Sequence, residues 1–196
     1  MTVRHLAAGC LLLAVPSGAA AQAGNRFELR REIPEGGLVV LRNIIGPVQL
    51  QPAPGRTLEV SGVKKEGRHG DPEDVEIRTV ELEKGIAICV FYPSDWGSRD
   101  RHYGDRHQHR RRESEDPCER ERDCCGNTRN DTRVEFTLKV PAGIRLDAKS
   151  VTGDVVGSGL HGEVDVASVS GDVRLSGIQA GALEAGEPHE IGRAHV

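Results

Sequence analysis

Cysteine and histidine are the residues of this chain with the most distinctive chemistry. After the first 23 residues the chain has four cysteines, Cys89, Cys118, Cys124 and Cys125, and three histidines fall in the same region, His102, His107 and His109. Thiolate and imidazole groups together can hold a metal such as zinc, whereas thiols in an oxidising compartment form disulfides. The spacing must decide between these two kinds of site.

The cysteine spacing favours disulfides. Cys118 and Cys124 lack the close pairing of zinc knuckles, and the His107-x-His109 pair lies in an expected loop. Four cysteines allow three pairings, and adjacent Cys124 and Cys125 are poorly placed to bond each other. We therefore expect one of these two to bond Cys118 and the other to reach Cys89. A metal site built from the same cysteines and histidines is the alternative.

Aspartates recur at a fixed interval near the C-terminus. Asp147 and Asp154 are followed 18 residues later by Asp165 and Asp172, so stacked repeats would align them in columns. Such columns could bind calcium, which prefers carboxylate and carbonyl oxygens. The paired glycines of the nonapeptide calcium repeat are missing, so turn aspartates that bond their own backbone are the favoured interpretation.

No residues combine into a recognisable catalytic set. Ser150 and Ser168 occupy repeat positions, which explains them as turn residues. The arginines at 110–112 could grip phosphate or sulfated sugar, but the acidic residues between Glu113 and Asp123 would neutralise them. We expect no enzyme activity, no cofactor and no resident metal.

The elements that must position these residues are short strands in a repeat. The phrase Ser150-Val151-Thr152-Gly153-Asp154-Val155 returns 18 residues later as Ser168-Val169-Ser170-Gly171-Asp172-Val173. Apolar and polar residues alternate within each copy, and glycines lie between the apolar runs, which indicates strands joined by tight turns. Val151, Val155 and Leu160 are expected to stack on Val169, Val173 and Ile178 of the next copy.

An earlier segment has the same spacing. Residues 43–50 match 168–175, with Gly46 at the position of Gly153 and Gly171. Strands are also expected at 57–63, 73–80 and 86–92, with a hairpin turn at Glu83-Lys84-Gly85. The sequence therefore predicts an all-β fold, a single-stranded β-solenoid with coils of about 18 residues. Its structural repeat residues would be Gly46, Gly153, Asp154, Gly171 and Asp172.

Residues 93–132 interrupt this pattern. They contain nine arginines, ten acidic residues, three histidines and three cysteines, with almost no aliphatic side chains. Such a segment cannot bury enough apolar surface to offset its ordering entropy. We expect a long charged loop inserted into the solenoid domain at 24–189.

The two ends of the chain have distinct features. Residues 1–23 have a basic start, an apolar run at 6–15 and small residues at a cleavage site, which indicates a signal peptide. Its loss removes Arg4 and changes the formal net charge from −4 to −5, which argues against nucleic acid as a partner. No later apolar run is long enough to span a membrane.

Residues 190–196 resemble one frame of a short-read sequencing adapter rather than protein. The third coil would begin at 181–185 and does not reach its own Val-x-Gly-Asp phrase. We therefore expect the natural gene to continue. An uncapped last coil would leave Val169, Val173, Leu175 and Ile178 exposed and favour self-association.

The signal peptide, the Asn43-x-x-Gly46 coil, the Val140-Pro141-Ala142-Gly143 turn and the two Val-[Thr/Ser]-Gly-Asp-Val phrases together resemble the "putative adhesin" family of exported bacterial β-solenoid domains. The resemblance covers residues 37–92 and 133–185. It implies an exported, non-catalytic domain, periplasmic or at the cell surface, that binds an envelope or surface protein or glycan. A metal-binding or redox-responsive envelope protein acting through 93–132 is the alternative.

Overall fold

Short strands make up most of the described residues. The structure, a computed structural model, describes residues 20–92, 116–120 and 130–179. The strands are β1 Ala20–Ala23, β2 Arg26–Glu32, β3 Leu38–Ile45, β4 Val48–Pro52, β5 Thr57–Lys65, β6 Glu76–Leu82, β7 Gly85–Phe91, β8 Arg133–Val140, β9 Ile144–Thr152, β10 Val155–Ser158, β11 Gly162–Ser170 and β12 Val173–Ser176. A 3₁₀ turn, η1 Pro72–Asp74, and a four-residue helix, α2 Pro117–Arg120, complete the described elements.

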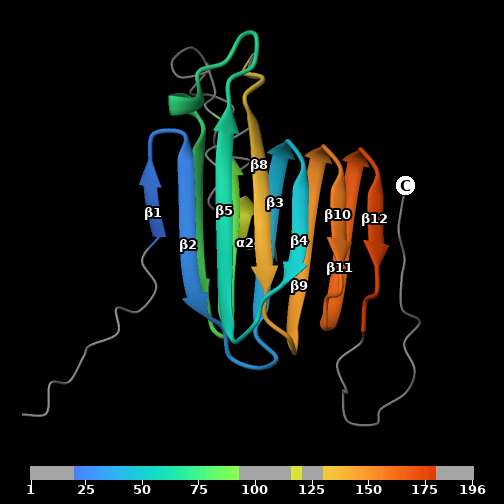
Figure 1. The fold of residues 1–196 in the computed structure, drawn as a ribbon. Helices are drawn as coiled ribbons and strands as arrows, with labels where there is room; N and C mark the ends of the chain where they lie inside the picture. The colour runs from blue at the N-terminus through green and yellow to red at the C-terminus, as the bar shows by residue number, and fades with distance from the viewer. Residues whose placement is uncertain (1–19, 93–115, 121–129, 180–196) are drawn as a thin grey trace, which may run out of the picture.

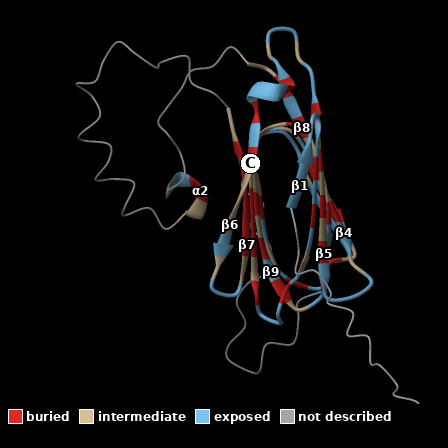
Figure 2. Ribbon diagram, turned by 90° about the vertical axis from the view of Figure 1, so that its left-hand side faces the viewer, coloured by how far each residue is buried: buried red, intermediate tan, exposed pale blue. Residues whose placement is uncertain are grey.

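The strands form two sheets that pack face to face. One sheet has seven strands in the order β1-β2-β5-β8-β4-β10-β12, and the other has five in the order β11-β9-β3-β7-β6. Figure 1 shows the seven-stranded sheet in front, and the edge-on view in Figure 2 shows buried residues between the two layers. The core comes from both sheets, with Phe27, Leu50, Leu58, Phe136 and Leu138 from one and Leu41, Ile86, Ile88 and Leu146 from the other.

The fold corrects our expectation of a single-stranded β-solenoid. Strand β2 pairs antiparallel with both β1 and β5, and β5 also pairs antiparallel with β8. Strand β6 pairs antiparallel with β7 through the expected hairpin turn. The molecule is therefore a two-sheet, sandwich-like fold with mixed strand directions. The prediction was wrong because it extended the geometry of the C-terminal repeat to segments such as 57–65 and 76–82, which lack the Ser-x-x-Gly phrase and pair as antiparallel strands.

The repeat itself forms a parallel stack along one side edge of the sandwich, where both sheets end. Ser150 pairs with Ser168 and Val155 with Val173, which is the 18-residue spacing. On the other side Asn43 pairs with Ser150 and Val48 with Val155, so the 43–50 segment is the first layer of the stack. This region supplies the edge strands β11 and β12.

The turn glycines let the layers approach closely. Gly46 has φ 128° and Gly153 has φ 145°, a backbone conformation that other residues rarely adopt. A Cβ atom on Gly153 would lie 2.2 Å from the carbonyl oxygen of Gly46, and one on Gly46 would lie 2.3 Å from that of Val134. The spacing of the layers therefore requires glycine at both turns.

Val151 and Val169 do not lie in the core as we expected. Their exposed fractions are 43% and 81%, whereas Ser150 and Ser168 are buried. Side chains alternate in a strand, and Leu146 and Ala148 already face inward, so the serines continue the inward row. Each serine hydroxyl is directed at a glycine carbonyl oxygen of the preceding layer, which allows the polar position to be buried.

Candidate functional site

The outer face of the five-stranded sheet carries an apolar patch, and part of the charged insert lies on it. Val40, Ala87 and Cys89 alternate with core residues, so they face away from the sandwich, and they are nevertheless buried. Cys118 of α2 joins their cluster. Four half-buried side chains pack around them, Leu38, Val80, Leu82 and Phe91. Helix α2 therefore helps to cover an apolar surface that would otherwise face solvent.

A disulfide fixes this contact. Cys89 bonds Cys118 across 29 residues of sequence, with a Cα–Cα distance of 5.4 Å. This corrects the expected bond from Cys118 to Cys124 or Cys125, because the position of α2 against β7 brings Cys118 to Cys89 instead. Cys124 and Cys125 lie outside the described residues. We call residues 116–119, together with Cys89 and Arg42, the clamp.

Arg42 is the electrostatic centre of the clamp. Its Nε donates to Asp116 Oδ2 at 2.5 Å, while Nη1 and Nη2 donate to the two carboxylate oxygens of Asp147 at 2.8 and 2.7 Å. Burial alone would lower the pKa of Arg42, but the hydrogen bonds to Asp147 and Asp116 outweigh it and raise that pKa. The guanidinium thus joins the insert, through Asp116, to strands β3 and β9.

Asp116 is held as a carboxylate. Burial would raise its pKa, yet the hydrogen bonds from Arg42 and from the backbone N–H of Cys118 lower it overall. Its Oδ1 accepts from that Cys118 N–H at 2.9 Å, so the same side chain begins α2 and binds the sheet. The ion pair, at Asp116, and the disulfide, at Cys118, lie two residues apart, and both hold the same short segment on the five-stranded sheet.

The ion pairs continue across the sheet as a ladder of alternating charge. Lys149 Nζ lies 3.3 Å from Asp147 Oδ1 and 3.6 Å from Asp165 Oδ2. We call Asp116, Arg42, Asp147, Lys149 and Asp165 the charge ladder. The side chain of Arg42 is 15% exposed and that of Asp165 is 64% exposed, so the ladder runs from the clamp outward to the edge strand β11. Its exposed members can meet a partner.

The two ends of the insert are tied together at one end of the sandwich. Tyr92 donates its hydroxyl hydrogen bond to the carbonyl oxygen of Thr132 at 2.6 Å. Burial raises the pKa of Tyr92, so the phenol stays protonated and remains a donor. The clamp thus belongs to a segment whose two ends meet at the contact between Tyr92 and Thr132.

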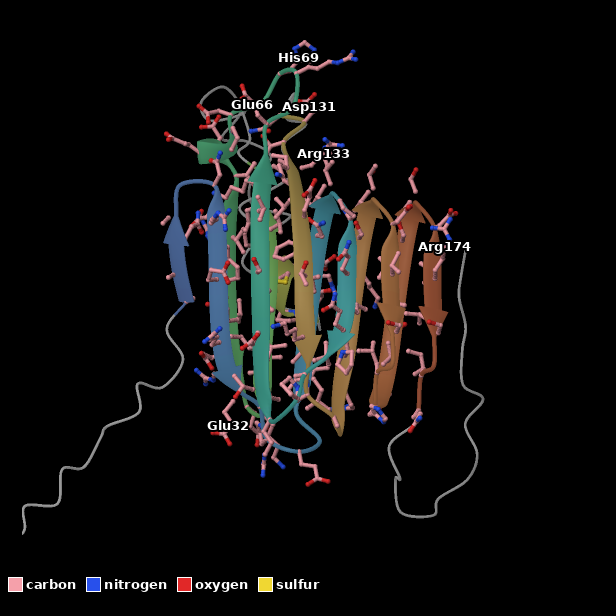
Figure 3. The ribbon with its side chains drawn as sticks, in the orientation of Figure 1. Glu32, Glu66, His69, Asp131, Arg133 and Arg174 are labelled. Carbon is pink, nitrogen blue, oxygen red and sulfur yellow. A yellow bond between two sulfur atoms is a disulfide. The ribbon has the colours of Figure 1, made fainter. Side chains whose placement is uncertain are left out.

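The residues before β8 also hold the loop that follows β5. Asp131 accepts from the backbone N–H groups of Arg68 and His69 at 2.8 and 2.9 Å, and these bonds lower its pKa. The amide of Asn130 donates to the carbonyl oxygen of Asp71. Figure 3 shows His69, Asp131 and Glu66 gathered at this end of the molecule.

Of the six residues considered as metal ligands, the structure describes Cys118 alone. Cys118 is bonded to Cys89, so its thiolate is not free to bind a metal. His102, His107, His109, Cys124 and Cys125 lie outside the described residues, as do the arginines at 110–112. Among residues 20–92, 116–120 and 130–179, no group of three or more histidine, cysteine or acidic side chains is arranged to hold a metal ion.

The turn aspartate Asp154 bonds the next layer rather than its own turn. Asp154 Oδ1 accepts from the backbone N–H of Asp172 in the next layer at 2.9 Å. Arg174 pairs with both carboxylates. The column of like charge that we considered for calcium is therefore interleaved with a cation.

Sequence reasoning missed the charge ladder. Arg42 directly follows an aliphatic run, Leu38-Val39-Val40-Leu41. This position was the one available signal, because a charged side chain beside buried residues needs a partner. Asp147 was identified only as part of an aspartate column, and Asp116 only as one of many acids in the insert. Pairing Arg42 with Asp147 required knowing that β3 lies beside β9.

Similarity to known proteins is distant. No protein-family model matches the chain, and neither does any curated protein. One solved structure that matches is that of a "putative cell adhesion protein" from Clostridium sporogenes, with 13% identity, a TM-score of 0.43 and coverage of 80% of this chain. Another is a "putative adhesin" from Bacteroides fragilis, with 11% identity, a TM-score of 0.29 and coverage of 77%. The matches span 63% and 62% of those two chains.

No helix among the described residues combines the length and the apolar character needed to cross a bilayer.

Proposed function

We propose that this protein is an exported, non-catalytic adhesin-like domain that binds a protein or glycan of the cell envelope through the outer face of its five-stranded sheet. The observation that carries the proposal is the clamp, which fixes part of a highly charged insert onto that face. Loops and insertions held by a rigid scaffold are common sites of recognition. The signal-like segment at 1–23, whose last four residues form strand β1, and the disulfide both support export to an oxidising compartment.

The opposite outer face supports this choice by contrast. On the seven-stranded sheet, Glu59 pairs with Lys139 and with Arg30. The Ser61 hydroxyl donates to Glu28. These polar groups satisfy one another across neighbouring strands, and that face carries no inserted segment among the described residues.

Two lysines with nearly equal exposure allow a matched test. Lys149 of the charge ladder is 44% exposed and Lys139 of the opposite face is 46% exposed. Binding of the labelled, oxidised protein to an envelope preparation would be measured for the wild type, Lys149→Gln and Lys139→Gln. We expect Lys149→Gln alone to weaken binding, by about threefold to tenfold for loss of one charge contact. Equal binding by all three proteins, or loss only with Lys139→Gln, would contradict the proposal.

The metal-binding or redox-responsive function through residues 93–132 remains the alternative. Of its candidate ligands, Cys118 is engaged in the disulfide. Metal analysis of the purified, oxidised protein with and without the insert separates the two functions. Stoichiometric zinc or copper that is lost with the insert would favour the alternative over a purely adhesive role.

A further inference from the structure

Lys64 places a charged side chain between the two sheets. It is the last member of the inward-facing row of β5, and it is only 2% exposed. A buried ammonium group is costly unless hydrogen bonds or opposite charges compensate for the water it has lost. Burial lowers the pKa of Lys64, and the negative charges of Glu76 and Glu73 offset only part of this shift. The amine therefore depends on a hydrogen-bond acceptor close by.

Gln22 of β1 supplies that acceptor. With its amide oriented to satisfy both neighbours, the Gln22 oxygen accepts from Lys64 Nζ at 2.9 Å, and the amide nitrogen donates to the carbonyl oxygen of Ile77 at 3.3 Å. Among the residues that the structure describes, this is the single hydrogen bond of Lys64 Nζ. Ile77 belongs to β6, so the one amide joins the buried lysine to the opposite sheet.

This amide closes the side of the sandwich that lies opposite the parallel stack (Figure 1). On that side β1 is the last strand of the seven-stranded sheet, and β6 is the last strand of the five-stranded sheet. Arg31 of β2 bridges the two sheets there as well, with hydrogen bonds of 3.1 and 2.7 Å to the Glu81 carboxylate. Polar bridges thus join the sheets along this side, and Gln22 is the bridge that comes from β1.

The bridge comes from the end of the segment that we interpret as a signal peptide. β1 consists of residues 20–23, and the small residues there form two possible cleavage sites. One site lies after Ala21, with Ala19 as the other small residue, and the second lies after Ala23, with Ala21 in that role. Cleavage at the first site keeps Gln22 in the mature chain, whereas cleavage at the second removes it.

We propose that export cleavage takes place at the Ala21–Gln22 bond, so that the mature chain begins with Gln22 and keeps the acceptor for Lys64. Water adds across this peptide bond, which leaves a carboxylate on Ala21 and an α-ammonium group on Gln22. The part of β1 that remains is the part nearest the turn, where Gln22 pairs with Phe27 of β2. The assignment rests on the export in the proposed function, but it concerns a different part of the molecule from the binding face.

Mass spectrometry of the exported protein identifies the bond that is cut. The full chain would be expressed in a bacterial host, and the protein recovered from the periplasm or the medium would be digested with trypsin. The N-terminal peptide of the mature chain then ends at Arg26, and we expect it to span residues 22–26. Ala23→Lys removes a small residue that only the later site needs, so it should leave this start unchanged.

The stability of the full, oxidised chain tests the physical reason without any need for export. Gln22→Ala should raise the equilibrium constant of unfolding by about tenfold, because Lys64 loses its acceptor. Gln49→Ala, which changes an exposed glutamine of β4, is the matched control and should have no effect. In a Lys64→Met background the cost of Gln22→Ala should shrink, since an apolar side chain needs no acceptor.

The outcomes separate this assignment from the proposed function. A start at Gly24 in the exported fraction would overturn the assignment and leave export intact, and a start at any other residue would overturn the choice of bond. An uncleaved chain retained inside the cell would overturn export and the assignment together. An equal cost of Gln22→Ala with Lys64 and with methionine at that position would remove the reason for keeping Gln22. The mapping uses the wild type, so it does not depend on how the variants fold.

Discussion

The two outer faces of the sandwich hold their polar groups in different ways. On the seven-stranded sheet, Glu59 and Lys139 pair between neighbouring strands, and their side chains are 32% and 46% exposed. On the five-stranded sheet, Arg42 is mostly buried and joins β3, β9 and the insert. The first face needs only local pairing, whereas the second depends on a segment whose Cys118 lies 29 residues after Cys89 of β7.

The difference follows from the side chains each face presents. Exposure of the apolar row at Val40 and Ala87 to water would raise the free energy of the fold, so this row needs a cover. Alternating charged and hydroxyl residues do not. The four-residue helix α2 is too short to be stable alone. The disulfide and the Arg42–Asp116 pair therefore supply the order that α2 itself lacks.

Removal of the disulfide should cause the largest loss of stability, and the loss should affect the five-stranded face only. A bond that closes a loop of this size contributes roughly 3 to 4 kcal/mol by the chain-entropy model. We expect the double variant Cys89→Ser, Cys118→Ser to melt well below the wild type and to bind an apolar dye at the newly exposed patch. The matched double variant Cys124→Ser, Cys125→Ser should leave the melting temperature unchanged. An equal loss of stability in the two double variants would contradict the proposed difference between the two faces.

Substitution of the central arginine should have the next largest effect. Arg42→Met leaves Asp116 and Asp147 without their shared cation in a partly buried site, and we expect a loss of about 2 kcal/mol after allowance for solvent screening. Arg30→Met on the seven-stranded face is the control, because the Arg30 side chain is 78% exposed, and it should have no measurable effect. Urea unfolding of both variants measures the difference. Equal losses would show that Arg42 is no more than a surface charge.

Acid should loosen the clamp by a smaller amount. The pKa of Asp116 is lower in the folded protein than in the unfolded chain, so its contribution is complete above the unfolded value of about 4 and is lost as pH falls through the folded value. Asp116→Asn should therefore be less stable than the wild type at pH 7, by on the order of 1 kcal/mol, and the gap should close below about pH 4. A gap that stays constant from pH 7 to pH 3 would exclude the ion pair as its cause.

The sequence carried enough information for the stack but not for the sandwich. The 18-residue phrase predicted that Ser150 lies beside Ser168 and that residues 43–50 form another layer, because each layer repeats the same local turn. Strands β2, β5 and β6 have alternating patterns that fit either parallel or antiparallel pairing, so nothing local excluded a solenoid. The direction of pairing was settled by loops and by packing between sheets.

The same limit explains the errors at the site. Disulfide connectivity depends on which face α2 contacts, and the short distance from Cys118 to Cys124 along the chain says nothing about that. The outward position of Val151 was missed because its apolar side chain suggested the core, while the buried serine beside it is stabilised by a hydrogen bond between layers. Contacts between segments far apart in sequence were the part that could not be predicted.

Peptide mapping of the non-reduced protein tests the clamp most directly. Trypsin cleaves after Lys84, Arg99, Arg112, Arg120 and Arg122, which separates Cys89, Cys118 and the Cys124-Cys125 pair into three peptides. We predict that residues 85–99 are recovered linked to residues 113–120. Recovery of 113–120 linked to the peptide that contains Cys124 and Cys125, or of Cys89 as a free thiol, would contradict the clamp and with it the assignment of the five-stranded face.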